Sequence, residues 1–313
     1  MFNNPIFKAT SLIKNSVGVV LFFVCGFAIY NKLLIQSDWQ NLKQSFSIQL
    51  QSIGILNWGI LIFLLFLNIW MEAIKWKIIV AKNNPITMAA SIKSILVGQA
   101  FAFFTPNRIG EYAGRTMFLS AGNQMKGITQ MAWTSYAQLL ITICIGSIGL
   151  WVNIAYYPWM QTNGMLLVKL MTPFLLILAL FLFFHEKHWK GKLSFLNVIQ
   201  IEPTVKLKLL GLSLLRYLIF IVQYGWIAYL LQMKISVEVL FLSLSILFLL
   251  LSILPTISIT ELVVRGQLLI LILKPFYSHQ VTIVSLSSII WGINFLVPAI
   301  LGTCLLLGYR INK

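Results

Sequence analysis

Two short stretches hold the charged side chains that an otherwise apolar chain could use to bind a ligand. Residues 104–115 contain two arginines and a glutamate, and residues 254–266 contain one arginine and one glutamate. In both stretches a proline and a short polar turn precede the pattern Glu-x-x-x-Arg. Glu111 and Glu261 stand 150 positions apart (261 − 111), close to half of the 313 residues. We interpret the two stretches as copies of one element that together form the functional centre.

Each Glu-x-x-x-Arg pair has the i, i+4 spacing that places both side chains on one face of a helix. A single charge at the centre of a bilayer costs between about 2.5 and more than 10 kcal/mol, and pairing lowers this cost. One interpretation is that the pairs Glu111–Arg115 and Glu261–Arg265 only neutralise themselves and stiffen their hairpins. The other is that the glutamates orient the arginines toward an anion, or contact a cationic part of a lipid headgroup.

Arg108 favours the anion-binding interpretation, because it stands in the first turn where we expect no acidic partner beside it. A guanidinium group matches a phosphate through two parallel hydrogen bonds. A helix that begins near Ile109 would also direct free N–H groups at the same turn. We predict one anionic-headgroup site shared by the two hairpin tips. Its predicted binding residues are Asn107, Arg108, Glu111, Tyr112, Arg115, Thr256, Ser258, Thr260, Glu261 and Arg265, and its predicted turn residues are Pro106, Gly110 and Pro255.

Other polar residues in the apolar runs predict more ordinary roles. Glu72 and Lys75 are expected to form a local pair, and Arg216 to reach the membrane interface. Three amides are predicted to make hydrogen bonds between helices or to line a cavity: Gln138, Gln223 and Asn294.

Catalytic motifs are missing from the sequence. It has no glycine-rich phosphate loop, no nucleophile elbow and no supported Ser/His/Asp set. Residues 185–188 read His-Glu-Lys-His, which differs from the His-Glu-x-x-His spacing of zinc helices. The three cysteines lie in apolar runs without metal or disulfide spacing. We therefore expect no enzyme activity, no cofactor and no metal.

Composition identifies the surroundings of these motifs as a membrane. The chain is 59% hydrophobic and 10% charged, whereas soluble domains have about 25% charged residues. Its net charge of +16 comes from basic residues dispersed between apolar runs. That placement is typical of topology signals and argues against nucleic acid as a partner.

The apolar runs predict an all-α membrane protein with a single domain, residues 1–313. A span needs about 20 mostly apolar residues. We expect two re-entrant hairpins, at 94–121 and 237–273, although the second has a first arm long enough to cross, and eight spans are the alternative. The six full spans are predicted near 16–35, 54–80, 127–151, 164–184, 208–232 and 280–307.

Matching segments in residues 54–151 and 208–307 predict an inverted repeat, the arrangement with which transporters build a central site. Residues 185–208 are rich in lysine, whereas residues 156–164 carry no charge. By the positive-inside rule both termini are expected to be cytoplasmic. We predict a multi-pass protein of the bacterial cytoplasmic membrane.

Both motifs resemble those of one known family. The residues that carry the resemblance are Pro106-Asn107-Arg108-Ile109-Gly110-Glu111 with Arg115 in the first motif, and Pro255-Thr256, Thr260-Glu261-Leu262 and Arg265-Gly266 in the second. The family is the lysylphosphatidylglycerol synthase transmembrane family, a flippase-like membrane domain. In some members of this family the membrane domain is fused to a soluble enzyme domain, and the first motif is glycine-rich. The Pro-Asn-Arg sequence of this chain differs from that form, which indicates a different branch of the family.

In the fused members the resemblance implies that the membrane domain moves an aminoacylated phospholipid between leaflets, while a soluble domain attaches the amino acid. We expect this chain to be the membrane domain alone, with a separate lipid-modifying enzyme as a partner. The predicted function is translocation of an anionic phospholipid or lipid-linked headgroup. The alternatives are an enzyme or accessory subunit of lipid-linked glycan synthesis, and a non-catalytic envelope scaffold.

Overall fold

A computed structural model describes residues 54–311, apart from 104, 106–107, 154–155, 157–162, 185–200 and 255–257. The described residues form helices and connecting turns, with no strand among them. The predicted span at 16–35 lies outside these residues, as do the predicted site and turn residues Pro106, Asn107, Pro255 and Thr256. The prediction of an all-α protein is confirmed for the described part of the chain.

Membrane spans follow from the length and composition of the helices. Three apolar helical stretches in the described part are long enough to cross a bilayer: Ile55–Val80, Gln124–Val152 and Gln280–Leu307. They cover three of the six predicted spans, which is consistent with a membrane protein. Two further predicted spans correspond to α7 (Asn163–Phe184) and α8 (Pro203–Leu230), which are not among these three.

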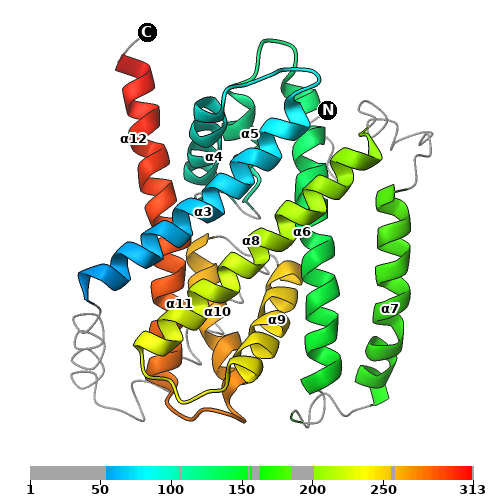
Figure 1. Cartoon of the computed structure of the whole chain (residues 1–313), viewed down its shortest axis with the longest axis vertical. Coiled ribbons are helices and arrows are strands. Elements are labelled where there is room, and N and C mark those ends of the chain that lie inside the picture. Colours follow the sequence, from blue (N-terminus) through cyan, green and yellow to red (C-terminus); the bar gives the residue numbers. More distant parts are fainter. Residues whose placement is uncertain are drawn as a thin grey trace, which may run out of the picture.

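The three longest helices pack against one another. α3 (Ile55–Val80) and α8 lie side by side and run in opposite directions (Figure 1). α6 (Gln124–Asn153) packs against α8 and α3. Many large apolar side chains on α3, α7 and α8 are exposed, as expected of helices that face lipid.

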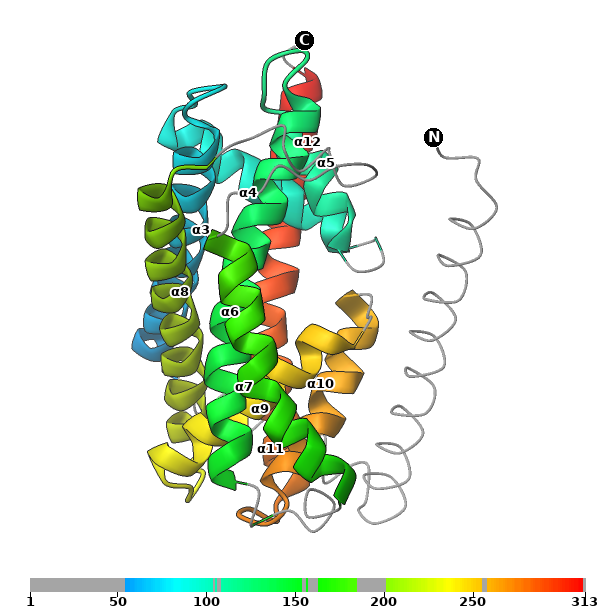
Figure 2. The same cartoon turned by 90° about the vertical axis from the view of Figure 1, so that its right-hand side faces the viewer.

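Two pairs of shorter helices occupy opposite halves of the molecule (Figure 2). α4 (Met88–Phe103) and α5 (Gly110–Thr116) form one pair, and α9 (Val237–Ile253) and α10 (Ser258–Leu273) form the other. α4 begins six residues before the predicted arm at residue 94 and has 16 residues, whereas α5 has only 7. The two arms of the first hairpin are therefore less equal than the sequence predicts.

Glycines allow α5 to lie directly on α4. A Cβ atom on Gly114 would lie 2.7 Å from the Cα atom of Gly98, and one on Gly110 would lie 2.4 Å from the carbonyl oxygen of Phe101. Gly110, predicted as a turn residue, is instead the first residue of α5 and is needed for this contact. Arg108, in this connection, has a positive φ of 58°.

The last helical stretch changes its winding in the middle. It consists of α11 (Gln280–Trp291), a π-helical turn at Gly292–Leu296 and α12 (Val297–Ile311). Such turns are rare, and they often occur at functional sites. The side chains of Asn294 and Phe295 in this turn are buried.

Candidate functional site

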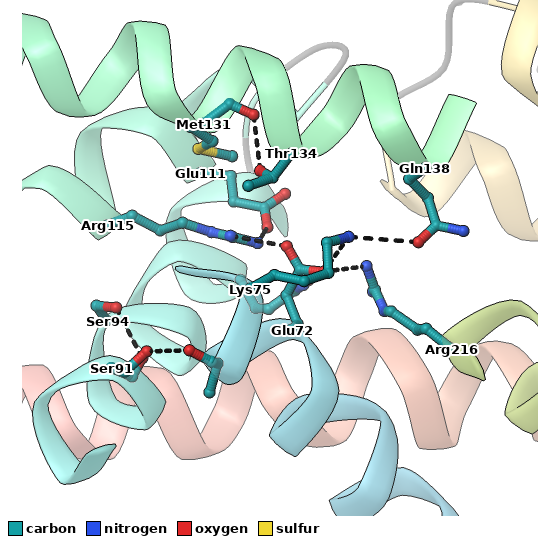
Figure 3. A network of polar contacts seen from close by, with 12 residues as sticks. Glu72, Lys75, Ser91, Ser94, Glu111, Arg115, Met131, Thr134, Gln138 and Arg216 are labelled. Atoms are coloured by element: carbon teal, nitrogen blue, oxygen red, sulfur yellow. Dashed lines mark hydrogen bonds and ion pairs between the residues drawn. The ribbon is translucent and has the colours of Figure 1, made fainter. Parts of the chain in front are cut away.

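A carboxylate on α3 lies at the centre of a buried network of charges. Glu72 is 4% exposed. Its Oε1 atom is 2.8 Å from Nη1 of Arg115, and its Oε2 atom is 2.6 Å from Nη1 of Arg216 and 3.0 Å from Nζ of Lys75 (Figure 3). One carboxylate thus joins α3, α5 and α8. The predicted Glu72–Lys75 pair is confirmed, but it is only one part of this larger group.

Arg115 connects Glu72 to the first predicted motif. Its Nη2 atom donates a hydrogen bond to Glu111 on the same helix, as the i, i+4 spacing predicts, and its side chain is 2% exposed. Arg115 follows Gly114, which packs on α4, and its Cγ atom would lie 2.9 Å from a Cβ atom on Gly98, so the side chain also passes close to α4.

Arg108 has more partners than the sequence predicts. Its Nη2 atom donates to Oε1 of Gln99 at 2.6 Å, and its Nε atom lies 3.5 Å from Oε2 of Glu111. The expectation that it lacks an acidic partner is therefore wrong. Its side chain is still 33% exposed, against 2% for Arg115, so Arg108 remains accessible.

The expected group of free N–H donors at the start of α5 is not found. The N–H of Gly110 donates to the Thr105 hydroxyl at 2.8 Å, and the helix has only 7 residues. Arg108 itself stands in a left-handed conformation that costs a residue with a side chain of order 1–3 kcal/mol. Strain of this kind is typical of functional sites, where the surrounding structure holds it in place.

A cavity of about 350 Å³ opens beside this network. Six charged residues line it: Glu72, Lys75, Arg108, Glu111, Arg115 and Arg216. One wall is a single stripe of α6: Met131, Thr134, Ser135, Gln138, Leu139 and Thr142. Four cations and two carboxylates give the lining a formal excess of two positive charges. The cavity is therefore suited to an anion.

The second motif forms a pair of its own, outside the lining of this cavity. Arg265 donates one hydrogen bond to Glu261, as the spacing predicts, and another to the Tyr224 hydroxyl at 2.7 Å. Both members of the pair are buried.

One aromatic ring connects the two motifs. The Cζ atom of Arg108 lies 5.0 Å from the ring centroid of Phe295, and the Cζ atom of Arg265 lies 5.4 Å from it. Both distances are in the range of cation–π contacts. The structure thus brings an arginine from each motif to the π-helical turn, although the second pair does not reach the cavity itself.

The remaining predicted site residues have separate positions. Tyr112 lines the cavity. Thr260 is buried on α10, and Ser258 is the first residue of that helix.

The three amides that were predicted to bond between helices or to line a cavity all make hydrogen bonds to or from another helix. Asn294 donates to Oε1 of Gln223 at 2.8 Å, which confirms a hydrogen bond between α8 and the last helical stretch. Gln138 contributes both to packing and to the cavity, because it lines the cavity and donates to the Ser213 carbonyl at 3.3 Å.

Sequence reasoning missed the role of Arg216. We expected it at the membrane interface, but its Nε atom donates to Oδ1 of Asn68 at 2.8 Å and its Nη1 atom pairs with Glu72. Ionisable residues within spans are site candidates by default, and that rule, applied to Glu72, Lys75 and Arg216, was the available signal. Among the described residues, no group of three His, Cys, Asp or Glu side chains could hold a metal ion.

No family model, curated protein or solved structure matches this chain. The resemblance noted above therefore rests on the motif residues alone.

Proposed function

We propose that this protein binds an anionic phospholipid or lipid-linked anionic headgroup in the charged cavity and moves it across the membrane. One observation carries the proposal. Within an apolar helical protein, four cations and only two carboxylates line a cavity of about 350 Å³.

A purely structural charge cluster would be expected to balance itself. Charged groups in the membrane are costly unless they are paired, and a cluster that serves only packing gains nothing from two excess cations. Glu72 and Glu111 already contact all four cations of the cavity, Glu72 contacting three and Glu111 two. An anion from outside the protein would complete the neutralisation.

Two of the arginines are accessible to such an anion. The side chains of Arg108 and Arg216 are 33% and 18% exposed, whereas those of Lys75 and Arg115 are 1% and 2% exposed. We assign contact with the headgroup to Arg108 and Arg216. Lys75 and Arg115 hold the carboxylates in place. Arginine suits the first role because its planar group binds phosphate oxygens in pairs.

The proposed architecture is six spans and two re-entrant hairpins in the bacterial cytoplasmic membrane, with both termini in the cytoplasm and inverted halves at 54–151 and 208–307. The hairpin helices occupy opposite halves of the molecule (Figure 2), and α3 and α8 run antiparallel (Figure 1). Both features support halves of opposite orientation. Transporters use such halves to expose a central site to each side in turn.

A leaflet-resolved assay tests the function. Purified protein is reconstituted into liposomes that hold a labelled anionic phospholipid, and its appearance in the other leaflet is measured over time. We expect wild-type protein to accelerate this exchange, and Arg108→Ala and Arg216→Ala to slow it. Lys234→Ala, which alters an exposed cation after α8, is the control and should match wild type.

Two results would contradict the proposal. One is exchange no faster than in protein-free liposomes for every anionic lipid tried. The other is wild-type exchange by both arginine variants, which would favour a scaffold role for the charged network.

A further inference from the structure

We propose that the headgroup selected by this cavity is a dianion, namely a terminal phosphate or a diphosphate, rather than a phosphodiester or a zwitterion. This inference rests on the proposed function and specifies its substrate class. It is carried by the charge count of the lining together with the partners that each charged group already has.

The formal charge of the lining sets the charge of the ligand. Two carboxylates against four cations leave an excess of two positive charges. A phosphodiester headgroup carries one negative charge and would leave one cation uncompensated. A phosphomonoester carries about −1.5 to −2 charges near neutral pH, and a diphosphate carries one or more on each phosphoryl group. Only these last two match the excess.

Donor groups for such an anion remain on two walls of the cavity. Among the described residues, no hydrogen bond involves Nη1 of Arg108 or Nη2 of Arg216. The first arginine comes from the connection between α4 and α5, and the second comes from α8. Two guanidinium groups from different walls can each bind oxygens of one terminal phosphate, or of neighbouring phosphoryl groups. A phosphodiester has two free oxygens and offers fewer sites to this arrangement.

The carboxylates are poorly placed to recognise a headgroup amine. Glu72 accepts from Arg115 and Arg216 and pairs with Lys75, and Glu111 is held by Arg108 and Arg115. An ammonium group entering the cavity would meet four cations and no unpaired carboxylate in the lining. Ethanolamine and aminoacyl headgroups are therefore disfavoured.

The opening of the cavity suits a lipid with its chains outside the protein. Ser135 and Leu139 on α6 line the cavity and are also exposed, and Ser252 near the end of α9 is exposed as well. The charged lining residues come from other elements, namely α3, α5, α8 and the connection before α5. A phosphate can reach the arginines while an apolar tail passes Leu139 into the surrounding lipid.

Binding to nanodiscs distinguishes the headgroups. The protein is placed in phosphatidylcholine nanodiscs at physiological ionic strength, and phosphatidic acid and phosphatidylglycerol with identical acyl chains are added separately at low mole fraction. Lipid occupancy is measured by native mass spectrometry. We expect phosphatidic acid to bind at least about tenfold more tightly at pH 7.5, the effect of one additional charge-assisted hydrogen bond.

A pH series gives an independent readout. The second ionisation of a phosphomonoester has a pKa near 6, so binding of phosphatidic acid should strengthen between about pH 5 and pH 7.5. Phosphatidylglycerol keeps the same single charge over this range and should show little change. Equal affinity for the two lipids at pH 7.5, or parallel pH profiles, would overturn the dianion inference.

Charge variants link the preference to the cavity. Arg216→Gln lowers the formal excess of positive charge in the lining from two to one. The remaining excess no longer favours a second negative charge on the ligand. The preference for phosphatidic acid over phosphatidylglycerol should therefore fall to less than about threefold. Lys208→Gln removes an exposed cation from the same helix and should retain the full preference. Arg108→Gln serves as the second variant if Arg216→Gln does not fold, and the same loss is expected. An unchanged preference in the folded variant would contradict the inference.

The outcomes also separate this inference from the function on which it rests. Binding of phosphatidylglycerol as tight as that of phosphatidic acid, together with its exchange between leaflets, would refute the dianion while leaving lipid translocation intact. Occupancy by neither anionic lipid above the phosphatidylcholine background would refute both.

Discussion

Replacing Glu72 by glutamine is expected to destabilise the protein more than any other isosteric change in the charged network. The carboxylate makes contacts of 2.6, 2.8 and 3.0 Å with Arg216, Arg115 and Lys75 and is almost fully buried. The neutral amide has nearly the same shape, so the change removes charge without creating a cavity. The formal excess of the lining rises from two positive charges to three.

The size of the effect follows from what each cation retains. Arg115 keeps its hydrogen bond to Glu111, and Arg216 keeps its 2.8 Å hydrogen bond to Asn68 and a cation–π contact with Phe220 but no carboxylate. Lys75 keeps a long 3.5 Å contact with Gln138. Lys75, which is buried, and Arg216, which is 18% exposed, therefore lose their counter-ion. Removing one partner of a buried ion pair costs about 3–5 kcal/mol, and we expect a loss in this range.

A double-mutant cycle identifies the cause. Arg216→Gln in the Glu72→Gln background returns the formal excess to two charges, and it should recover about 1–3 kcal/mol of the free energy of unfolding. The assay is denaturant unfolding of purified protein in a mild detergent. Glu238→Gln changes an exposed glutamate in the first turn of α9 and should have little effect. A Glu72→Gln variant as stable as wild type, or additive effects in the double variant, would refute the role given to Glu72.

Three further changes can be measured in the same unfolding assay. Arg108→Gly should be about 1 kcal/mol more stable than Arg108→Ala, because glycine accepts the φ of 58° without strain; the reverse order would contradict this. Tyr224→Phe removes a 2.7 Å hydrogen bond to a buried arginine and should cost about 1.5–3 kcal/mol, whereas Tyr229→Phe, at a 72% exposed position on the same helix, should be neutral. Gly114→Ala should destabilise the first hairpin because the new Cβ atom would lie 2.7 Å from the α4 backbone. In Gly211→Ala the new Cβ atom meets open space, so this control should stabilise α8 by up to about 1 kcal/mol. Equal effects of the two alanines would count against the close contact between α4 and α5.

Features that depend on local spacing could be predicted from the sequence. The helical i, i+4 spacing correctly predicted Glu111–Arg115 and Glu261–Arg265 as pairs. Apolar runs of sufficient length predicted the three helices that could cross a membrane. Both predictions use only the period of the helix and the thickness of the bilayer, which do not depend on distant parts of the chain.

Features that depend on packing between distant segments could not be predicted in this way. Arg216 and Glu72 are 144 positions apart, and nothing in either segment indicates that α3 and α8 lie side by side. The same limit applies to Phe295, whose contacts with both motifs arise from a π-helical turn in an ordinary apolar sequence. The motif arginines were found, but the carboxylate at the centre of the site was not.

The most direct test of the account is to identify the lipid that lies in the cavity. A photo-crosslinking residue is placed at Leu139, which lines the cavity and is 37% exposed, or at Ile177 on α7, which is 67% exposed and lies outside the lining. After irradiation in native membranes, the attached lipids are identified by mass spectrometry. We predict that lipids with a terminal phosphate or diphosphate are enriched at position 139 over position 177, and that Arg108→Ala abolishes the enrichment. The same lipid composition at both positions would contradict the central claim that this cavity holds an anionic headgroup.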